Sequence, residues 1–122
     1  MVMRCLIVDD SPVFLRAARA LLEREGSAVI TASTGVEAWR LLDEVDPDVV
    51  LIDIDLGEEN GFDLVAQLSR RAAEGGTPPV ILISSHGIED FEELIVDSAA
   101  RGFISKSTLS AAAIRSMMSG GR

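Results

Sequence analysis

The sequence predicts an α/β fold in which five parallel strands form one sheet with helices on both of its faces. Short apolar runs alternate five times with segments whose apolar residues recur every three or four positions. The run from Val49 to Ile52 has no polar interruption, which is typical of a strand buried on both faces. Right-handed crossovers between parallel strands then restrict how such a chain can wind.

The first half of the chain contains three expected strands and two expected helices. Ser11 is a suitable N-cap, and Pro12 suits the first turn of the helix that follows it. Ser33 or Thr34 caps the second helix, and the sequence Asp46-Pro47-Asp48 ends it. The expected elements are strand 3–8, a helix that Gly26 ends, strand 28–32, a helix with Ala38, Leu41, Leu42 and Val45 on its apolar face, and a central strand that ends at Asp53.

The second half continues the alternation after a polar loop, Gly57-Glu58-Glu59-Asn60-Gly61. A breaker, Gly75-Gly76-Thr77-Pro78-Pro79, separates the third helix from the fourth strand. We expect residues 1–118 to form one domain, and residues 119–122 to form a flexible tail or the start of a linker. The expected elements are strands at 80–83 and 103–105, and helices with apolar faces at Leu64, Val65, Leu68 and Ala72, at Phe91, Leu94 and Ile95, and at Leu109, Ala113, Ile114 and Met117.

The composition excludes several classes of protein. The chain has 122 residues, of which 48% are hydrophobic and 25% charged, as is typical of one globular domain. Its formal charge of −9 argues against direct binding to nucleic acid, because phosphate contacts need a basic surface. No apolar run approaches the roughly 20 residues of a membrane span, and we expect no signal peptide. A single cysteine, Cys5, lies in an apolar strand, so a buried reduced thiol in a cytoplasmic protein is expected.

Polar residues follow four of the predicted strands at the points where the strands end. Because the carboxyl ends of parallel strands meet at one edge of a sheet, we expect these side chains to lie together. An ionised carboxylate inside the central strand would be costly unless paired, which places Asp53 where that strand emerges. The residues are Asp9 and Asp10 after the first strand, Asp53 at the end of the third, Ser84 at the end of the fourth, and Lys106 after the fifth.

This set of residues favours phosphoryl transfer to an aspartate. Three nearby carboxylates repel one another, and a hard divalent cation such as Mg²⁺ relieves the repulsion. Asp53 would then be the nucleophile, as aspartates are in other phosphoryl transfers. Lys106 would offer a fixed positive charge and Ser84 a hydroxyl donor to the phosphoryl oxygens. Each residue alone also has a structural explanation, as a helix cap, a turn residue or a solvated charge, and only their combination carries the argument.

The motifs resemble those of the receiver domain, the phosphoacceptor module of two-component response regulators. They cover nearly the whole chain, and five of them stand in register. The matching segments are Leu6-Ile7-Val8-Asp9-Asp10, Pro47-Asp48-Val49-Val50-Leu51-Ile52-Asp53, Gly61 eight residues after Asp53, Pro79-Val80-Ile81-Leu82-Ile83-Ser84-Ser85, and Gly102-Phe103-Ile104-Ser105-Lys106.

The resemblance implies a flavodoxin-like, doubly wound sheet of strand order 2-1-3-4-5 with five helices and a site between the first and third strands. It implies that Mg²⁺ is held by Asp10, Asp53 and the backbone carbonyl of Asp55, with Asp9 assisting. It also implies phosphotransfer to Asp53 from a sensor histidine kinase or a histidine phosphotransfer protein. Slow self-catalysed hydrolysis would reset the switch, so the chain would be a phosphoacceptor rather than an enzyme.

Family analogy also suggests how the switch would work. A phosphoryl group on Asp53 would attract Ser84, and the space that opens would let Phe103 rotate inward. The face formed by the fourth helix, the fifth strand and the last helix would change, and a homodimer through this face is permitted. In the family, the positions of Asp55 and His86 flank the path of the attacking water, so these two residues are candidates for tuning dephosphorylation.

Two departures from the family pattern concern the loops of the site. Gly57 stands where proline is usual, four residues after the phosphoacceptor, which suggests a more mobile loop. Lys106-Ser107 replaces a lysine-proline step that is usually cis, and a trans bond is expected here because serine disfavours the cis form. Lys-Ser before a small-residue helix is similar to receivers of LuxR-type transcription regulators. A single-domain regulator and a receiver from a longer chain both stay open.

Two rival functions remain. The segment Val50–Asp55 also resembles the nucleophile motif of haloacid-dehalogenase-type phosphatases, in which the second aspartate acts as acid and base. The order of motifs argues against that family, because its Asp-x-Asp lies on the first strand and its acidic metal-binding pair comes last. An interaction module that works without phosphorylation is the other alternative.

Overall fold

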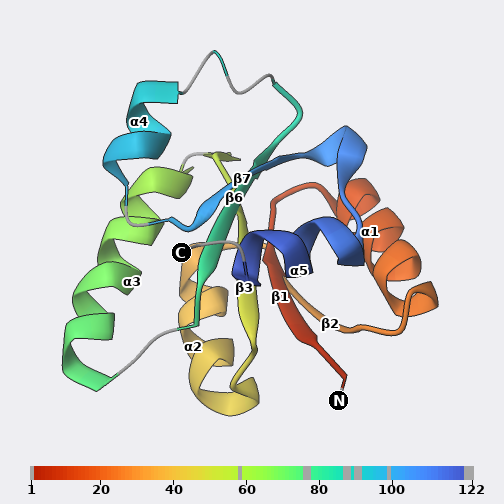
Figure 1. The fold of residues 1–122 in the computed structure, drawn as a ribbon. Helices are drawn as coiled ribbons and strands as arrows, with labels where there is room; N and C mark the ends of the chain where they lie inside the picture. Colours follow the sequence, from red (N-terminus) through yellow and green to blue (C-terminus); the bar gives the residue numbers. More distant parts are fainter. Residues whose placement is uncertain are drawn as a thin grey trace.

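The central layer of the computed structural model is a five-stranded parallel sheet of order β2-β1-β3-β6-β7 (Figure 1). The structure describes residues 2–57, 59–75, 78–86, 89, 92–98 and 100–119. Counted within this sheet alone, the order is the predicted 2-1-3-4-5, with β1 and β3 paired at the centre. The strands are β1 (Arg4–Val8), β2 (Ala28–Ala32), β3 (Val49–Asp53), β6 (Val80–Ser84) and β7 (Gly102–Ser105).

Four α-helices connect these strands and a fifth follows the last strand, as predicted, and two of them begin with the expected type of cap. The Ser11 hydroxyl accepts a hydrogen bond from the amide of Phe14 at 3.2 Å. Thr34, rather than Ser33, caps the second helix by accepting from the amide of Glu37 at 3.1 Å. The helices are α1 (Pro12–Arg24), α2 (Gly35–Val45), α3 (Gly61–Gly75), α4 (Glu92–Asp97) and α5 (Ala111–Ser119); the expected contribution of Phe91 lies outside the described residues.

The sheet separates two hydrophobic cores, one on each face. Helices α1 and α5 cover one face, where Leu22 and Ile114 pack against Ile7 of β1. Helices α2 and α3 cover the other face, where Leu42 and Leu68 belong to the second cluster (Figure 1). Because side chains alternate along a strand, every residue of β3 is buried by one of the two layers. This explains the uninterrupted apolar run that predicted the central strand.

The predicted polar loop after β3 is in part a two-stranded antiparallel ribbon. Strand β4 (Asp55–Leu56) pairs with β5 (Glu59–Asn60), so that Asp55 lies opposite Asn60. Gly57 turns the chain between them at a φ of 60°, a conformation that glycine adopts without a steric penalty. The strands have only two residues each, too short for an apolar alternation to show in the sequence.

The last helix begins at Ala111, two residues later than expected. A short 3₁₀ turn, Lys106–Thr108, follows β7, and Leu109 is extended. The amide of Ala111 donates to Oε1 of Glu25 at 2.7 Å, so the residue that caps the end of α1 also holds the start of α5. No cis peptide bond occurs among the described residues, and the Lys106–Ser107 bond is trans as expected.

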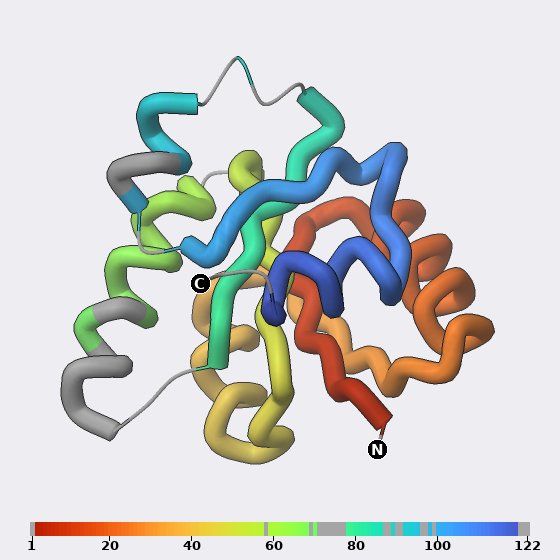
Figure 2. The backbone as a smooth tube through the Cα atoms, viewed as in Figure 1, coloured from red at the N-terminus to blue at the C-terminus, as the bar shows by residue number. Residues whose placement is uncertain are grey.

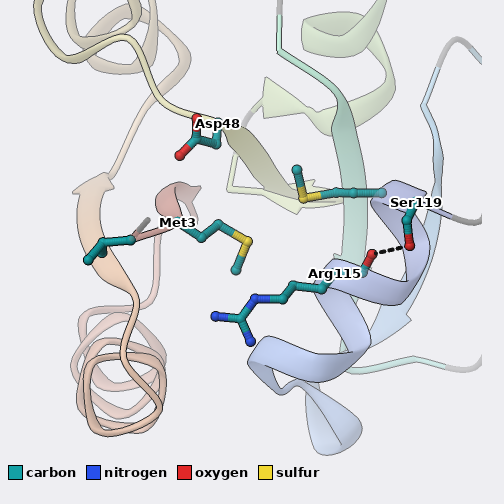
Figure 3. A pocket seen from close by; sticks show the side chains of 6 residues that line it. Met3, Asp48, Arg115 and Ser119 are labelled. Carbon is teal, nitrogen blue, oxygen red and sulfur yellow. Dashed lines mark hydrogen bonds between the residues drawn. The ribbon is translucent and has the colours of Figure 1, made fainter.

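The opposite edge of the sheet, where the strands begin, carries an open pocket of about 500 Å³ (Figure 3). Met3, Asp48 and Arg115 line it, and the hydroxyl of Ser119 donates to the carbonyl of Arg115 at 3.0 Å. Cys5, in β1, is fully buried, and its burial raises the pKa of the thiol to about 11. This pocket therefore lies at the far end of the strands from the polar residues that follow them.

Two further observations concern the limits of the fold. Within the described part of the chain, no helix is long and apolar enough to span a membrane. Ser119 is the last residue of α5, and residues 120–122 lie outside the described residues (Figure 2, where they are grey). The division into a domain at 1–118 and a tail at 119–122 therefore stays a prediction.

Candidate functional site

The structure brings the predicted site residues together at the carboxyl edge of the sheet. Asp9 follows β1, Asp53 ends β3 and Ser84 ends β6, and all three are buried. Lys106 follows β7 and is partly buried, whereas Asp10 is exposed. Burial of three polar side chains at one edge is unusual in a small domain and marks this edge as the candidate site.

Three carboxylates form the centre of the site. One oxygen from each of Asp9, Asp10 and Asp53 lies within 4.8 Å of the other two. This donor set contains only oxygen atoms, which are the ligands that hard divalent cations prefer. Gly57 lies so close to Oδ2 of Asp10 that a Cβ at this position would approach it to 2.9 Å. The residues present therefore fit a metal ion on the exposed side of the cluster.

Lys106 reaches the buried side of the same cluster. Its Nζ lies 2.7 Å from Oδ2 of Asp9 and 3.2 Å from Oδ2 of Asp53. The ring of Phe14, in the first turn of α1, lies 4.4 Å from the same nitrogen, close enough for a cation–π contact. Burial lowers the pKa of Lys106, but its hydrogen bond to Asp9 and the charges of Asp53 and Asp9 outweigh this effect and raise it. Lys106 is thus a permanent positive charge beside Asp53.

Asp53 is less acidic than an ordinary aspartate. Its pKa is raised from 3.8 to about 6, chiefly by burial and then by the neighbouring charge of Asp9, against the opposing effect of Lys106. A carboxylate held in this way is poorly solvated and close to a like charge. Its ionised form is therefore more basic than that of an ordinary aspartate, and a nearby cation would stabilise it.

This pKa predicts a pH-dependent stability for the metal-free protein. Because the folded-state pKa of Asp53 lies above 3.8, this group stabilises the fold fully only below that pH, and the contribution is lost as pH rises through about 6. We compare the free energy of unfolding of Asp53→Asn with that of wild type. The difference, variant minus wild type, should increase by about 2 kcal/mol when the pH is raised from 4.5 to 7.5. Urea unfolding of both proteins in chelator at the two pH values measures this, and a pH-independent difference would contradict it.

Backbone amides fix the orientation of the buried oxygens. Oδ1 of Asp9 accepts from the amide of Ser11 at 2.9 Å, and Oδ1 of Asp53 accepts from the amide of Asp55 at 3.2 Å. The hydroxyl of Ser84 accepts from the amide of His86 at 2.9 Å, which leaves its proton available to another acceptor. In both Asp9 and Asp53, Oδ2 is the oxygen that lies next to Nζ of Lys106.

Gly61 allows the start of α3 to pack against the end of β3. A Cβ at this position would collide with the carbonyl oxygen of Asp53 and would lie 2.9 Å from the Cα of Ile54. The amide of Gly61 donates to the carbonyl of Ile54 at 2.9 Å. The glycine noted in the sequence thus has a steric role directly behind the candidate nucleophile.

The residues proposed for tuning and switching occupy different surroundings. Nε2 of His86 lies 3.7 Å from Oδ2 of Asp55, and both side chains are exposed at the mouth of the site. Phe103 is half-buried and packs against the core on the α2 and α3 side. Sequence reasoning missed Phe14 as a member of the site, since its helical spacing indicates only a place on the apolar face of α1.

Comparison with known proteins gives a family match over most of the chain. A family model described as the response regulator receiver domain matches residues 5–118. The transcriptional regulatory protein KdpE of Mycobacterium tuberculosis is 37% identical over 101 residues, which cover 83% of this chain and 43% of KdpE. Protein PilH of Pseudomonas aeruginosa is 36% identical over 103 residues, which cover 84% of each chain. The chain thus spans less than half the length of KdpE.

Solved structures agree with the fold. The chemotaxis response regulator CheY4 of Vibrio cholerae superimposes with a TM-score of 0.78 at 21% identity and covers both chains completely. A two-component response regulator of the LuxR family from Aurantimonas sp. SI85-9A1 gives a TM-score of 0.80 at 25% identity, covering 99% of this chain and 86% of the other. These similarities support the architecture described above.

Proposed function

Since this chain belongs to the response regulator receiver domain family, we propose that it is a signalling switch controlled by phosphorylation of Asp53. Receiver domains of two-component systems are phosphoacceptors that interact with histidine kinases. The single observation that carries the proposal is the position of Asp53. It is buried at the end of β3, beside two other carboxylates and within 3.2 Å of the ammonium group of Lys106.

The proposed metal is Mg²⁺, held by Asp10, Asp53 and the backbone carbonyl of Asp55, with Asp9 assisting. When bound, Mg²⁺ would neutralise negative charge on the carboxylates and on an incoming phosphoryl group. The carboxylate cluster supports this assignment because its oxygens lie within reach of one ion. Asp9 already has one oxygen paired with Lys106, which agrees with an assisting role rather than a principal one.

The proposed reaction transfers a phosphoryl group from a phosphohistidine. An oxygen of Asp53 forms the new bond to phosphorus while the bond between phosphorus and the histidine nitrogen breaks, and that nitrogen keeps the electron pair. Lys106 and Ser84 would stabilise the phosphoryl oxygens as charge and hydroxyl donor. The donor would be a sensor histidine kinase or a histidine phosphotransfer protein. Slow hydrolysis at Asp53 would return the chain to its starting state without turnover of an external substrate.

Incubation with acetyl phosphate tests this proposal directly. We expect one phosphoryl group per chain by intact mass, formed in Mg²⁺ and absent in chelator. Continuous release of phosphate from a phosphomonoester without an adduct would support the haloacid-dehalogenase-type phosphatase instead. If both adduct and turnover are absent, with acetyl phosphate and with a phosphorylated histidine donor, the result favours an interaction module that works without phosphorylation.

Ser84 is proposed to couple phosphorylation to the face formed by α4, β7 and α5. Its hydroxyl accepts from the amide of His86 and keeps its own proton for a phosphoryl oxygen, so a movement of Ser84 towards that oxygen would pull on the loop that follows β6. We expect Ser84→Ala to accept the phosphoryl group. It should lose most of the changes in NMR chemical shift that phosphorylation causes around Phe103 in wild type. Heteronuclear NMR spectra before and after phosphorylation measure them, and unchanged responses in the variant would contradict the coupling.

His86 and Asp55 are proposed to tune dephosphorylation. Their side chains approach to 3.7 Å across the mouth of the site, where an attacking water would enter. We expect His86→Ala to accelerate loss of the phosphoryl group severalfold, because removing the ring opens the site to water. Loss of the adduct over time in intact mass measures this rate. Ser85→Ala, at the exposed neighbouring position, is the control and should leave the rate unchanged.

The wider assembly is also a proposal. A homodimer would use α4, β7 and α5, where Ile95 and Phe103 supply half-buried apolar side chains. The net charge of −9 argues against direct contact of this domain with nucleic acid. The resemblance of Lys106-Ser107 to LuxR-type receivers supports a transcriptional output in the protein that carries this domain.

A further inference from the structure

A second cavity lies on the α2 and α3 side of the sheet, apart from the acidic cluster. It has a volume of about 320 Å³ and is formed by the first two turns of α2 and α3 together with strand β5. This volume is at the small end of the range of ligand pockets, about 300–1,000 Å³, and suits one side chain or a small group. We call it the α2–α3 pocket, and its walls include Val36, Trp39, Glu59, Asp63 and Gln67.

The charge of the α2–α3 pocket is negative. Glu59 and Asp63 contribute carboxylates to its walls, and none of the described lining residues is basic. Oε1 of Glu59 accepts from the amide of Gly35 at 2.9 Å, which fixes this side chain at the start of α2. Asp63 lies in the first turn of α3, and its side chain is exposed. One carboxylate is thus held in place and a second is exposed to an incoming cation.

An aromatic side chain forms another wall of the pocket. The indole nitrogen of Trp39 donates to Oε1 of Gln67 at 3.0 Å, a bond that joins α2 to α3 and fixes the ring. Val36, one turn before Trp39, is 79% exposed and is an unusually open apolar residue for this chain. The pocket therefore combines carboxylates, an oriented indole ring and an apolar rim.

We propose that the α2–α3 pocket binds an arginine side chain of a partner polypeptide. A guanidinium group is planar, pairs with carboxylates through two parallel hydrogen bonds and stacks on indole rings. Glu59 and Asp63 supply the carboxylates for such pairing, and Trp39 supplies the indole ring for stacking. Val36 would contact an apolar residue next to the arginine in the partner polypeptide. A free small cation would leave Val36 exposed to solvent. The net charge of −9 would attract such a basic segment from a distance.

The α2–α3 pocket is connected to the acidic cluster through a short stretch of chain. Glu59 belongs to β5, which pairs with β4, and β4 follows Asp53 after one residue. Gly57, in the turn of the same ribbon, lies beside Asp10. A segment held by Glu59 would therefore sit on the ribbon that borders the acidic cluster, although its binding does not require phosphorylation of Asp53.

Trp39 is the chain's single tryptophan, so its indole resonance and its fluorescence report on the pocket without labelling. We would titrate the full chain with a capped pentapeptide that carries arginine between two leucines. The same peptide with citrulline, which has the shape of arginine without its charge, is the matched control. We expect a saturable change at Trp39 for the arginine peptide and binding at least about tenfold weaker for the citrulline peptide.

Two variants locate the binding. Glu59→Gln keeps an acceptor for the amide of Gly35 but removes the charge, and Asp63→Asn removes the second charge. We expect each to weaken the arginine peptide severalfold, whereas Glu93→Gln, which removes an exposed charge on α4, leaves it unchanged. Equal binding of the citrulline peptide, or equal weakening by Glu93→Gln, would overturn the proposal. The same saturable change with guanidinium ion alone would show a small-cation site and reject a polypeptide partner.

Discussion

Asp53→Asn abolishes uptake of the phosphoryl group from acetyl phosphate in the presence of Mg²⁺. Asparagine fills the same volume, but its amide is not a nucleophile towards phosphorus. Asp9 is not a substitute nucleophile, because it is fully buried with one oxygen bound to an amide and the other paired with Lys106. We expect the rate of adduct formation to fall by about 10²-fold or more. Intact mass measured over time in parallel with wild type gives both rates.

Asp55→Asn is the matched control for this substitution. It makes the same chemical change two residues further on, at an exposed side chain. The proposed metal contact of Asp55 uses its backbone carbonyl, which the substitution leaves in place, so the adduct should still form. If Asp53→Asn formed as much adduct as wild type, the phosphoryl group would be attached to another residue. The proposed function would then lose its basis.

Lys106→Met lowers the free energy of unfolding of the metal-free protein by about 2–3 kcal/mol at pH 7.5. Methionine keeps much of the aliphatic packing but removes the positive charge between Asp9 and Asp53, whose nearest oxygens lie 2.7 and 3.2 Å from Nζ. Two buried carboxylates then face each other without a cation. The contact of the ammonium group with the ring of Phe14 is lost as well. Urea unfolding in chelator measures the change.

Mg²⁺ should restore part of the lost stability in this variant, because a bound cation would again balance the carboxylates. Arg40→Met is the control, since the ion pairs of Arg40 with Glu37 and Glu44 are exposed and their loss should cost about 0.5 kcal/mol or less. Equal effects of the two substitutions would show that Lys106 is an ordinary surface lysine.

The sequence predicted the main sheet and its helices because their signals are local and strong. The apolar run that ends at Asp53 can be buried on both faces only at the centre of a sheet, and the order of the strands followed from the resemblance to receiver domains. The clustering of the candidate site residues was predictable for the same reason: each lies at or just after the end of a strand, so the parallel arrangement alone brings them to one edge.

Other features depend on contacts between distant residues and leave no local signal. Glu25 and Ala111 are 86 positions apart, and nothing near either residue indicates that one carboxylate holds the start of α5. The contact between Phe14 and Lys106 depends on how α1 lies against the end of β7. The ribbon of β4 and β5 was predicted only as a polar loop, because its pairing relies on the turn at Gly57.

The division of the apolar side chains by the sheet has a consequence for how such a chain can diverge. A change of side-chain volume beside α1 or α5 must be compensated by residues of the same layer, since the strand backbones stand between the two cores. Substitutions in one layer can therefore accumulate independently of those in the other layer. Neighbours along a strand, such as Phe103 and Ile104 of β7, belong to opposite layers, so adjacent positions of one strand should diverge independently of each other.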